Sequence, residues 1–217
     1  MNIMKICVVM YYDSNVSEYA DLNFKINKLY CDKYNFDIIF SNEPVFKDRH
    51  PVWERLPLII KHIEKYDYMI WIDGDAFFYI HSNILDIIKK YTDMDFIFSK
   101  DIDWSHHDGN YLNAGFFIVK NTPYSIEFIN KWSYDEELHA QNPTPYWREQ
   151  GVLNYMYNNN ILNIQNKCVC LTYGILQHFY VNEYGCDWAK EPYVLHLSGQ
   201  GNEERINAST NYYNKIK

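Results

Sequence analysis

Two acidic side chains, Asp73 and Asp75, stand one residue apart at the end of an apolar run. The run 69–72 is typical of a buried strand, and acids that directly follow such a strand lie at the rim of a sheet, where α/β folds bind ligands. Carboxylate oxygens beside Gly74 suit Mg²⁺ or Mn²⁺, whereas Zn²⁺ prefers histidine and cysteine. The pair predicts a divalent-cation site, and the competing interpretation is a solvated turn.

A second polar segment, Asn113-Ala114-Gly115, leads into an apolar run that predicts a strand over 115–119. From the residues alone, we expect a small turn that feeds this strand. Glycine at this place permits a close approach of the backbone to a ligand. The segment is therefore either a plain strand start or part of a binding pocket.

A third segment, Glu149-Gln150, stands near the start of a run with helical period. The dipole of such a helix stabilises a carboxylate at its N-terminus by ~0.3–1 kcal/mol, so a structural role for Glu149 is one interpretation. Participation in chemistry is the other. The sequence does not indicate which of the two side chains points inward.

The fourth segment is a histidine, His196, that ends an apolar run and is followed by Gly199 and Gly201. A lone histidine after a strand is more often a structural or surface residue than a ligand. An imidazole nitrogen beside two carboxylates is nevertheless a suitable ligand set for Mn²⁺.

These four segments together resemble the motifs of nucleotide-sugar glycosyltransferases with the GT-A fold, nearest to the galactosyl-, mannosyl- and xylosyltransferase group. The triplet 73–75 is similar to the Asp-X-Asp signature of these enzymes, and the resemblance implies that His196 completes their metal site. It further implies that Asn113, Ala114 and Gly115 line the donor-sugar pocket. In similar transferases an acidic-Gln pair such as 149–150 faces the anomeric carbon and the acceptor hydroxyl.

The resemblance also assigns residues to the nucleotide of the donor. Tyr11, Tyr12 and Asp13 would flank the base and the ribose, since aromatic faces stack and a carboxylate accepts hydrogen bonds from hydroxyl groups. The segment Pro51-Val-Trp-Glu-Arg55 resembles a Trp-X-Lys segment of related enzymes, with Arg55 in place of the lysine. An exposed arginine at a helix start is the alternative for Arg55.

The turn after His196 departs from the family pattern. Gly199 and Gly201 belong to a glycine turn whose backbone amides approach the diphosphate in metal-dependent relatives, but many retaining relatives carry a lysine where this chain has Asn202. Either Arg205, one turn later, or the metal is then left to neutralise the diphosphate. The departure favours an alternative function, a catalytically inert nucleotide-sugar or glycan-binding module.

The expected activity is a metal-dependent transfer of a sugar from a nucleotide diphosphate, with UDP-hexose as the expected donor, to a hydroxyl of a glycan or small acceptor. Retention of configuration is expected from the nearest group, and it needs no dedicated base. Inversion would require a carboxylate such as Asp103, Asp108 or Glu149 to deprotonate the acceptor. A nucleotidyltransferase is disfavoured because the segment 11–15 lacks the glycines of a phosphate loop.

Apolar runs at 6–10, 36–40, 69–72 and 96–98 alternate with segments of helical period, which predicts a mostly parallel, Rossmann-like α/β sheet flanked by helices, as in the GT-A fold. In the first helix, the shared apolar face is expected to contain Leu22, Ile26, Leu29 and Tyr30. The segment 135–147 is expected to be irregular because it contains two prolines. A length of 217 residues with 47% hydrophobic content predicts one domain over residues 1–217.

Composition disfavours several partners. The net charge of −8, without any Lys/Arg-rich segment, argues against nucleic acid. The apolar start of the chain is too short for a signal peptide or membrane span. Cys168 and Cys170 alternate within an apolar run, as core strand residues do, so a disulfide framework is not expected and the predicted location is the cytoplasm. The acceptor pocket is expected around His106 and Tyr146, with the segment 179–188 as a further candidate, and the oligomeric state is not predicted.

Overall fold

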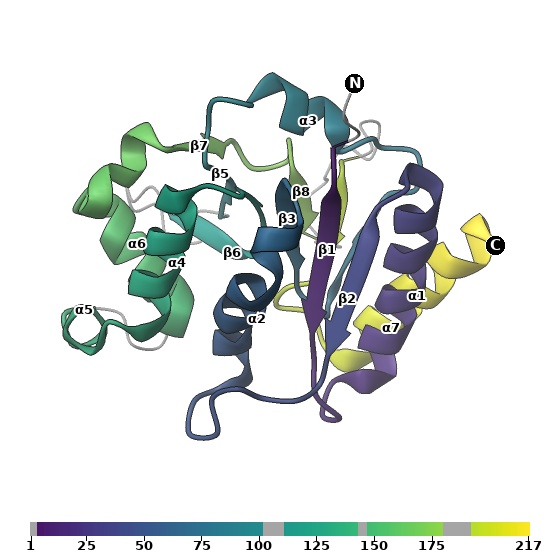
Figure 1. Cartoon of the computed structure of the whole chain (residues 1–217). Helices are drawn as coiled ribbons and strands as arrows, with labels where there is room; N and C mark the ends of the chain where they lie inside the picture. The colour runs from purple at the N-terminus through teal and green to yellow at the C-terminus, as the bar shows by residue number, and fades with distance from the viewer. Residues whose placement is uncertain (1–3, 102–110, 143–146, 180–191) are drawn as a thin grey trace.

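The computed structural model describes residues 4–101, 111–142, 147–179 and 192–217, and a six-stranded sheet forms its centre (Figure 1). The strand order is β2-β1-β3-β6-β5-β7. Strand β6 is antiparallel to both of its neighbours, whereas β1 pairs in parallel with β2 and β3, and β5 with β7. The predicted mostly parallel sheet is therefore confirmed. Its strands are β1 (Ile6–Tyr11), β2 (Asp37–Ser41), β3 (Tyr68–Ile72), β5 (Phe96–Lys100), β6 (Leu112–Lys120) and β7 (Cys168–Leu171).

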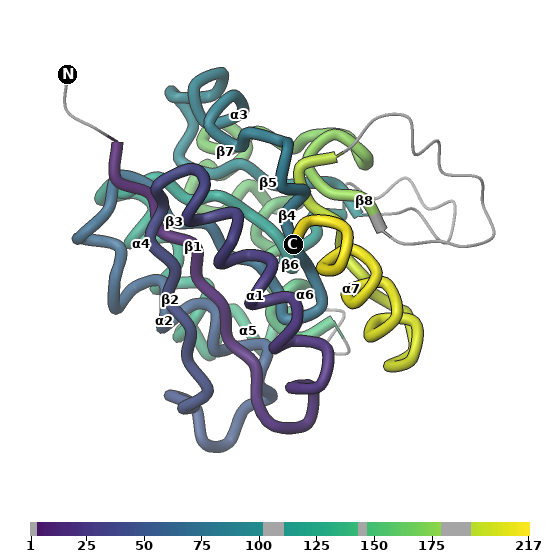
Figure 2. The backbone as a smooth tube through the Cα atoms, turned by 90° about the vertical axis from the view of Figure 1, so that its right-hand side faces the viewer, coloured from purple at the N-terminus to yellow at the C-terminus, as the bar shows by residue number. Residues whose placement is uncertain are grey.

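Helices cover both faces of this sheet because its strands are apolar on both sides. Val9 and Trp71 belong to a core that includes α2, α4 and α6, whereas their neighbours Val8 and Ile70 belong to a core that includes α1 and α3. Helix α7 packs along α1, as Figure 2 shows from the side. The helices are α1 (Ser17–Tyr34), α2 (Arg55–His62), α3 (Leu85–Lys90), α4 (Pro123–Tyr134), α5 (Glu136–Ala140), α6 (Arg148–Asn158) and α7 (Asn202–Ile216).

A second sheet, which the sequence did not predict, has the order β4-β9-β8. It consists of β4 (Ala76–Phe78), β8 (Gln177–Phe179) and β9 (Val194–His196). Strands β4 and β9 are antiparallel, with Ala76 opposite His196. This pairing carries His196 to the acidic pair, because β4 begins directly after Asp75.

The buried face of α1 differs from the predicted one. Leu29 is 39% exposed, so its assignment to the apolar face was wrong, whereas Asn23 and Asn27 are completely buried. The Asn27 side chain accepts a hydrogen bond from the Phe78 N–H at 2.9 Å and donates one to the Ala76 carbonyl at 3.1 Å. The buried Asn27 amide thus pairs with the short strand β4, and Asn23 donates to the Gly74 carbonyl at 2.8 Å, at positions where a hydrophobic pattern predicts only apolar residues.

Strand β6 also begins earlier than predicted. Asn113, Ala114 and Gly115 lie within the strand, so the expected turn before it was wrong. Phe98 pairs with Phe117 whereas Ser99 pairs with Asn113, and this register shift makes β6 bulge away from β5. A bulge re-aims side chains at the rim of a sheet, which explains the polar and small residues at this place.

The segment predicted to be irregular contains a short helix, α5, so that prediction was wrong in part. Asp135 caps it by accepting a hydrogen bond from the Leu138 N–H at 2.8 Å, which is the usual role of aspartate before a helix. Cys168 and Cys170 lie on β7 as expected, and both are free thiols. Among the described residues, no helix has the length and apolarity needed to cross a membrane.

Candidate active site

The ends of three neighbouring strands place the predicted site residues on one edge of the large sheet. Strands β1 and β3 run in parallel, so Tyr12 and Asp73, which follow them, lie at the same edge. Strand β6 runs in the opposite direction, so Asn113, near its start, also reaches this edge. The arrangement explains why segments far apart in the sequence contribute to one site.

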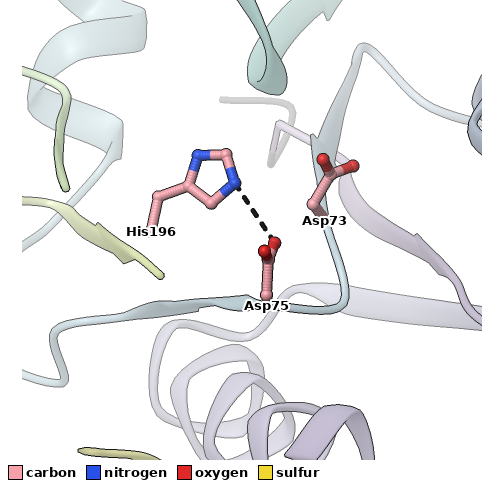
Figure 3. A group of neighbouring side chains, drawn as sticks. All are labelled: Asp73, Asp75 and His196. Atoms are coloured by element: carbon pink, nitrogen blue, oxygen red, sulfur yellow. Dashed lines mark ion pairs between the residues drawn. The ribbon is translucent and has the colours of Figure 1, made fainter. Parts of the chain in front are cut away.

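Asp73, Asp75 and His196 form a compact cluster at this edge (Figure 3). One potential ligand atom from each residue lies within 4.8 Å of the others. His196 Nε2 lies 3.2 Å from Asp75 Oδ1, close to the roughly 3 Å that separates two adjacent ligands 2.1 Å from an octahedral ion. Two carboxylates and an imidazole therefore fit a divalent cation such as Mn²⁺ both in chemistry and in spacing.

The imidazole of His196 is oriented by Gln177 of β8, a residue that no motif or periodicity singles out. His196 Nδ1 lies 3.2 Å from Gln177 Oε1, and both side chains are buried. The hydrogen bond leaves Nε2 on the side of Asp75, which is how a second contact normally fixes a metal-binding histidine. Only the pairing of β8 with β9 could reveal this contact.

Charges around the cluster compensate one another. Burial lowers the pKa of His196, but the neighbouring Asp75 carboxylate outweighs that effect and the pKa is raised. Burial raises the pKa of Asp75, but His196 and then Arg205 outweigh it, so the pKa is lowered. Asp75 is thus held ionised, as a metal ligand must be.

Arg55 connects the acidic triplet to the start of α6. Its side chain is 3% exposed, which rules out the exposed arginine considered above. The Nη2 atom lies 3.0 Å from Asp73 Oδ1 and 3.3 Å from Glu149 Oε1. Its Nη1 donates to the Ala114 carbonyl and its Nε to the Val52 carbonyl. A single guanidinium therefore fixes two carboxylates and two backbone segments.

The side chains of Glu149 and Gln150 both point into the site. The sequence had left open which of the two faces inward. Burial raises the pKa of Glu149 to about 7, although Arg55 opposes this effect. Among the described residues, its buried Oε2 has no hydrogen-bond partner. The Gln150 side chain accepts from the Ala114 N–H at 2.9 Å and donates to Asp101 Oδ2 at 3.0 Å.

Gly115 lies directly against the side chains of His196 and Asp73. A Cβ at this position would lie 2.2 Å from His196 Cε1 and 2.9 Å from Asp73 Oδ2. The Gly115 N–H donates to Asn113 Oδ1 at 2.8 Å, and the Gly115 carbonyl accepts from the Asp73 N–H at 2.8 Å. Glycine is required here because the backbone of β6 closely approaches the side chains of Asp73 and His196.

Two cavities meet at the cluster and share Val52, Arg55, Asp73 and Asp75. The larger has a volume of about 470 Å³, and its lining includes Tyr11, Tyr12, Asp13, Tyr19, His50, Gly74 and Arg205. The smaller has a volume of about 270 Å³, and its lining includes Asp101, Asn113, Gly115, Arg148, Glu149, Gln150 and His196. The residues expected at the nucleotide and those expected at the sugar are thus separated into two compartments.

Three predicted site residues lie outside both linings. Ala114 is completely buried and contributes only its backbone contacts to Arg55 and Gln150. Gly199 has a φ of 76°, and Gly201 is the N-cap of α7. The other predicted residues line at least one cavity, whereas four candidates for acceptor binding or catalysis lie outside the described residues: Asp103, His106, Asp108 and Tyr146.

Sequence comparison identifies the family. Residues 4–207 match the family described as nucleotide-diphospho-sugar transferase. The chain belongs to this family. Among curated relatives, it is 28% identical over 124 residues to galactomannan galactosyltransferase 1 of Cyamopsis tetragonoloba, covering 54% of this chain and 28% of that protein. It is 20% identical over 183 residues to an uncharacterized alpha-1,2-galactosyltransferase of Schizosaccharomyces pombe, covering 69% of this chain and 48% of that protein. The chain thus spans less than half the length of these relatives.

Solved structures confirm the GT-A fold of this nucleotide-diphospho-sugar transferase family member. One is a glycosyltransferase involved in the glycosylation of the major capsid of PBCV-1, with a TM-score of 0.75, 16% identity and coverage of 95% of this chain and 98% of that one. Another is the galactosyltransferase LgtC in complex with donor and acceptor sugar analogs, with a TM-score of 0.62, 13% identity and coverage of 94% and 95%. At these identities the likeness establishes the fold alone.

Proposed function

We propose that residues 1–217 form one glycosyltransferase domain. It transfers a sugar, with a hexose as the first candidate, from a UDP-sugar to a hydroxyl of a glycan or small acceptor, and it uses Mn²⁺ or Mg²⁺. The observation that carries this proposal is the position of the Asp73, Asp75 and His196 cluster at the junction of the two cavities. A donor that spans the junction would place its diphosphate beside the cluster, its nucleoside in the larger cavity and its sugar in the smaller one.

The reaction makes one bond and breaks another at the anomeric carbon of the sugar. The acceptor oxygen bonds to this carbon and passes its proton to a phosphate oxygen of the departing group, while the diphosphate leaves with the electron pair of the broken bond. A divalent ion on the Asp73, Asp75 and His196 cluster would act as a Lewis acid toward that leaving group. The protein contributes by fixing the orientation of the sugar, since a well-aligned reactant removes much of the entropic barrier.

The smaller cavity has the polar side chains that such orientation needs. Glu149 and Gln150 are held there by Arg55 and by the Ala114 N–H, so hydroxyl groups of a bound sugar would meet fixed partners. Within the described part of the chain Glu149 Oε2 is buried without a hydrogen-bond partner, and a sugar hydroxyl that reached it would supply one. This role requires no proton transfer, and it is compatible with the retention of configuration that we propose.

Retention is tested by NMR analysis of the product anomer. A product with the anomeric configuration of the donor supports it. An inverted product would require a base, and Glu149, which is ion-paired with Arg55, is then the first candidate among the described residues.

The donor is tested by thermal unfolding with UDP, GDP or CMP, each with Mn²⁺ and with EDTA. A ligand at a hundredfold its Kd stabilises the native state by ~2.7 kcal/mol, which corresponds to several degrees in a domain of this size. A rise in the unfolding temperature that occurs with UDP plus Mn²⁺, and with no other combination, supports the proposal and selects UDP-sugars for transfer assays. The absence of any metal-dependent rise would contradict it.

A nucleotide-dependent rise without sugar transfer or donor hydrolysis would instead favour an inert binding module. Asn202, which stands where many retaining relatives have a lysine, is the sequence feature that supports this second candidate. It begins α7 and lies outside the lining of both cavities. Single-turnover assays with purified protein and each UDP-sugar separate the two functions.

A further inference from the structure

Arg205 stands in the first turn of α7 and reaches back into the larger cavity. Its Nη2 donates to Asp75 Oδ2 at 2.9 Å, its Nε to the Leu197 carbonyl at 3.2 Å and its Nη1 to the Tyr19 hydroxyl at 3.3 Å. The guanidinium also lies over the Tyr19 ring, 5.0 Å from its centre. Four contacts from three chain segments therefore fix this cation beside a proposed metal ligand.

The contacts of Arg205 leave part of its hydrogen-bonding capacity unused. A guanidinium has five N–H groups, and three of them are occupied by the Asp75, Leu197 and Tyr19 contacts. The side chain keeps 18% of its surface exposed in the cavity. Within the part of the chain that the structure describes, one N–H on each terminal nitrogen therefore has no partner, and such a pair can bind phosphate oxygens in a forked arrangement.

Arg55, which also lines the larger cavity, has no comparable capacity to bind phosphate oxygens. Arg55 is 3% exposed and is shared between Asp73 and Glu149. The charges of Asp73 and Asp75 would balance a bound divalent ion. A diphosphate in the cavity would therefore keep uncompensated negative charge unless a further cation contacts it, and a charge taken out of water without a partner is costly.

We propose that Arg205 is a donor-binding residue that contacts the diphosphate of the nucleotide sugar and stabilises it as a leaving group. This inference rests on the proposed function. It assigns to the C-terminal helix the cation that the family pattern places at the position of Asn202. The contact with Asp75 keeps the guanidinium next to the metal ligands, so that Arg205 and a bound ion would approach the diphosphate from adjacent sides.

The test compares the wild type with Arg205→Ala, Arg205→Lys and the matched control Lys215→Ala, which removes the same charge from an exposed position of the same helix. Calorimetric titrations with UDP, UMP and uridine are performed at saturating Mn²⁺. Binding of Mn²⁺ alone is followed separately by EPR. Loss of a charge-assisted hydrogen-bond partner should weaken UDP binding by Arg205→Ala roughly tenfold to a hundredfold, leave uridine binding unchanged and affect UMP less than UDP.

The Mn²⁺ titration separates ligand contact from a structural role. If Arg205 contacts the diphosphate, Arg205→Ala binds Mn²⁺ without nucleotide at least as tightly as the wild type, because a competing cation has left Asp75. If Arg205 only positions Asp75, Arg205→Ala binds both Mn²⁺ and UDP more weakly, and its affinity for uridine falls by the same factor as its affinity for UDP. That result would overturn the proposal.

The remaining outcomes are also decisive. Wild-type protein that binds UDP, with Arg205→Ala binding it equally well, overturns the role of Arg205 alone. Wild-type protein that binds none of UDP, GDP and CMP with Mn²⁺ overturns the proposed function, and the role of Arg205 with it. Should Arg205→Ala fail to fold, Arg205→Lys, which keeps the charge but loses the fork, must still weaken UDP relative to uridine, and equal affinities would contradict the proposal.

Discussion

The Cα of Gly115 faces the imidazole of His196 so closely that a Cβ on residue 115 would lie 2.2 Å from His196 Cε1. The two residues come from different sheets, β6 in the large one and β9 in the small one. A glycine in one strand thus makes room for the histidine of another. The proposed metal site depends on this contact as much as on its ligands.

Replacing Gly115 by alanine should weaken Mn²⁺ binding roughly 10- to 100-fold, the usual range for residues that orient metal ligands. The new Cβ would displace His196, because the contact involves a buried ring that is already held by Gln177. EPR titration of free Mn²⁺ measures the effect. In the His196→Ala background the same substitution should cost less, because only the 2.9 Å contact with Asp73 Oδ2 remains, and an equal loss there would contradict the steric explanation.

Replacing Asp75 by asparagine should remove metal-dependent transfer, since the amide keeps the shape of the side chain but loses the charge that attracts the ion. Transfer from UDP-sugars is measured across a range of Mn²⁺ concentrations. Urea unfolding serves as the fold control, because Asp75 also pairs with His196 and Arg205. Unchanged turnover in a folded Asp75→Asn or Asp75→Ala variant would exclude Asp75 as a metal ligand.

Glu149 should make stability depend on pH. Burial raises its pKa to about 7 from the ordinary 4.5. The folded protein then binds this proton more tightly than the unfolded chain does, so the contribution to the free energy of unfolding is complete below pH 4.5 and is lost as the pH rises through 7. The loss amounts to roughly 3 kcal/mol.

The variant Glu149→Gln removes this titration, so its stability should fall less between pH 4.5 and 8 than that of the wild type. Urea unfolding at both pH values, in EDTA, gives the two differences. Loss of the ion pair with Arg55 changes the free energy of unfolding of the variant at both pH values. This constant offset cancels when the change between the two pH values is compared with that of the wild type. Identical pH dependence in the two proteins would show that Glu149 does not titrate in this range.

Asn154 should be a major structural residue of the site. Its side chain accepts from the Leu112 N–H at 2.6 Å and donates to the Leu112 carbonyl at 3.0 Å. Asn154→Ala would leave both buried groups unpaired and should lower the free energy of unfolding by roughly 2 kcal/mol or more. Asn158→Ala, at an exposed position of the same helix, should change it by less than about 0.5 kcal/mol. Similar losses in the two variants would contradict this assignment.

The large sheet was predictable because its strands carry strong local signals. The runs ending at Met10 and Ile72 are continuously apolar, and the helices between them bury a face on either side. Strand β4 and strand β9 have three residues each, too few for a periodicity to develop. The small sheet therefore escaped prediction although it carries His196.

Polar residues in the core limited the prediction in the same way. Asn27 and Asn154 are buried because each replaces a missing strand partner with its amide, and a hydrophobic pattern cannot indicate this. The same reasoning applies to Gln177, whose role becomes apparent from the 3.2 Å distance between its Oε1 and His196 Nδ1. Such residues become visible only when the backbone groups that they satisfy are known.

Residue type and local order were enough to indicate an α/β fold, a pair of acids at a strand end and a histidine suited to the same ion. These properties are local, since they follow from burial patterns and from ligand chemistry. The tertiary structure decided which of these groups meet: it paired β4 with β9, turned both Glu149 and Gln150 inward and brought Arg205 from the last helix to Asp75. Such contacts join residues from 36 to 130 positions apart, and they depend on how the two sheets and their helices pack in three dimensions.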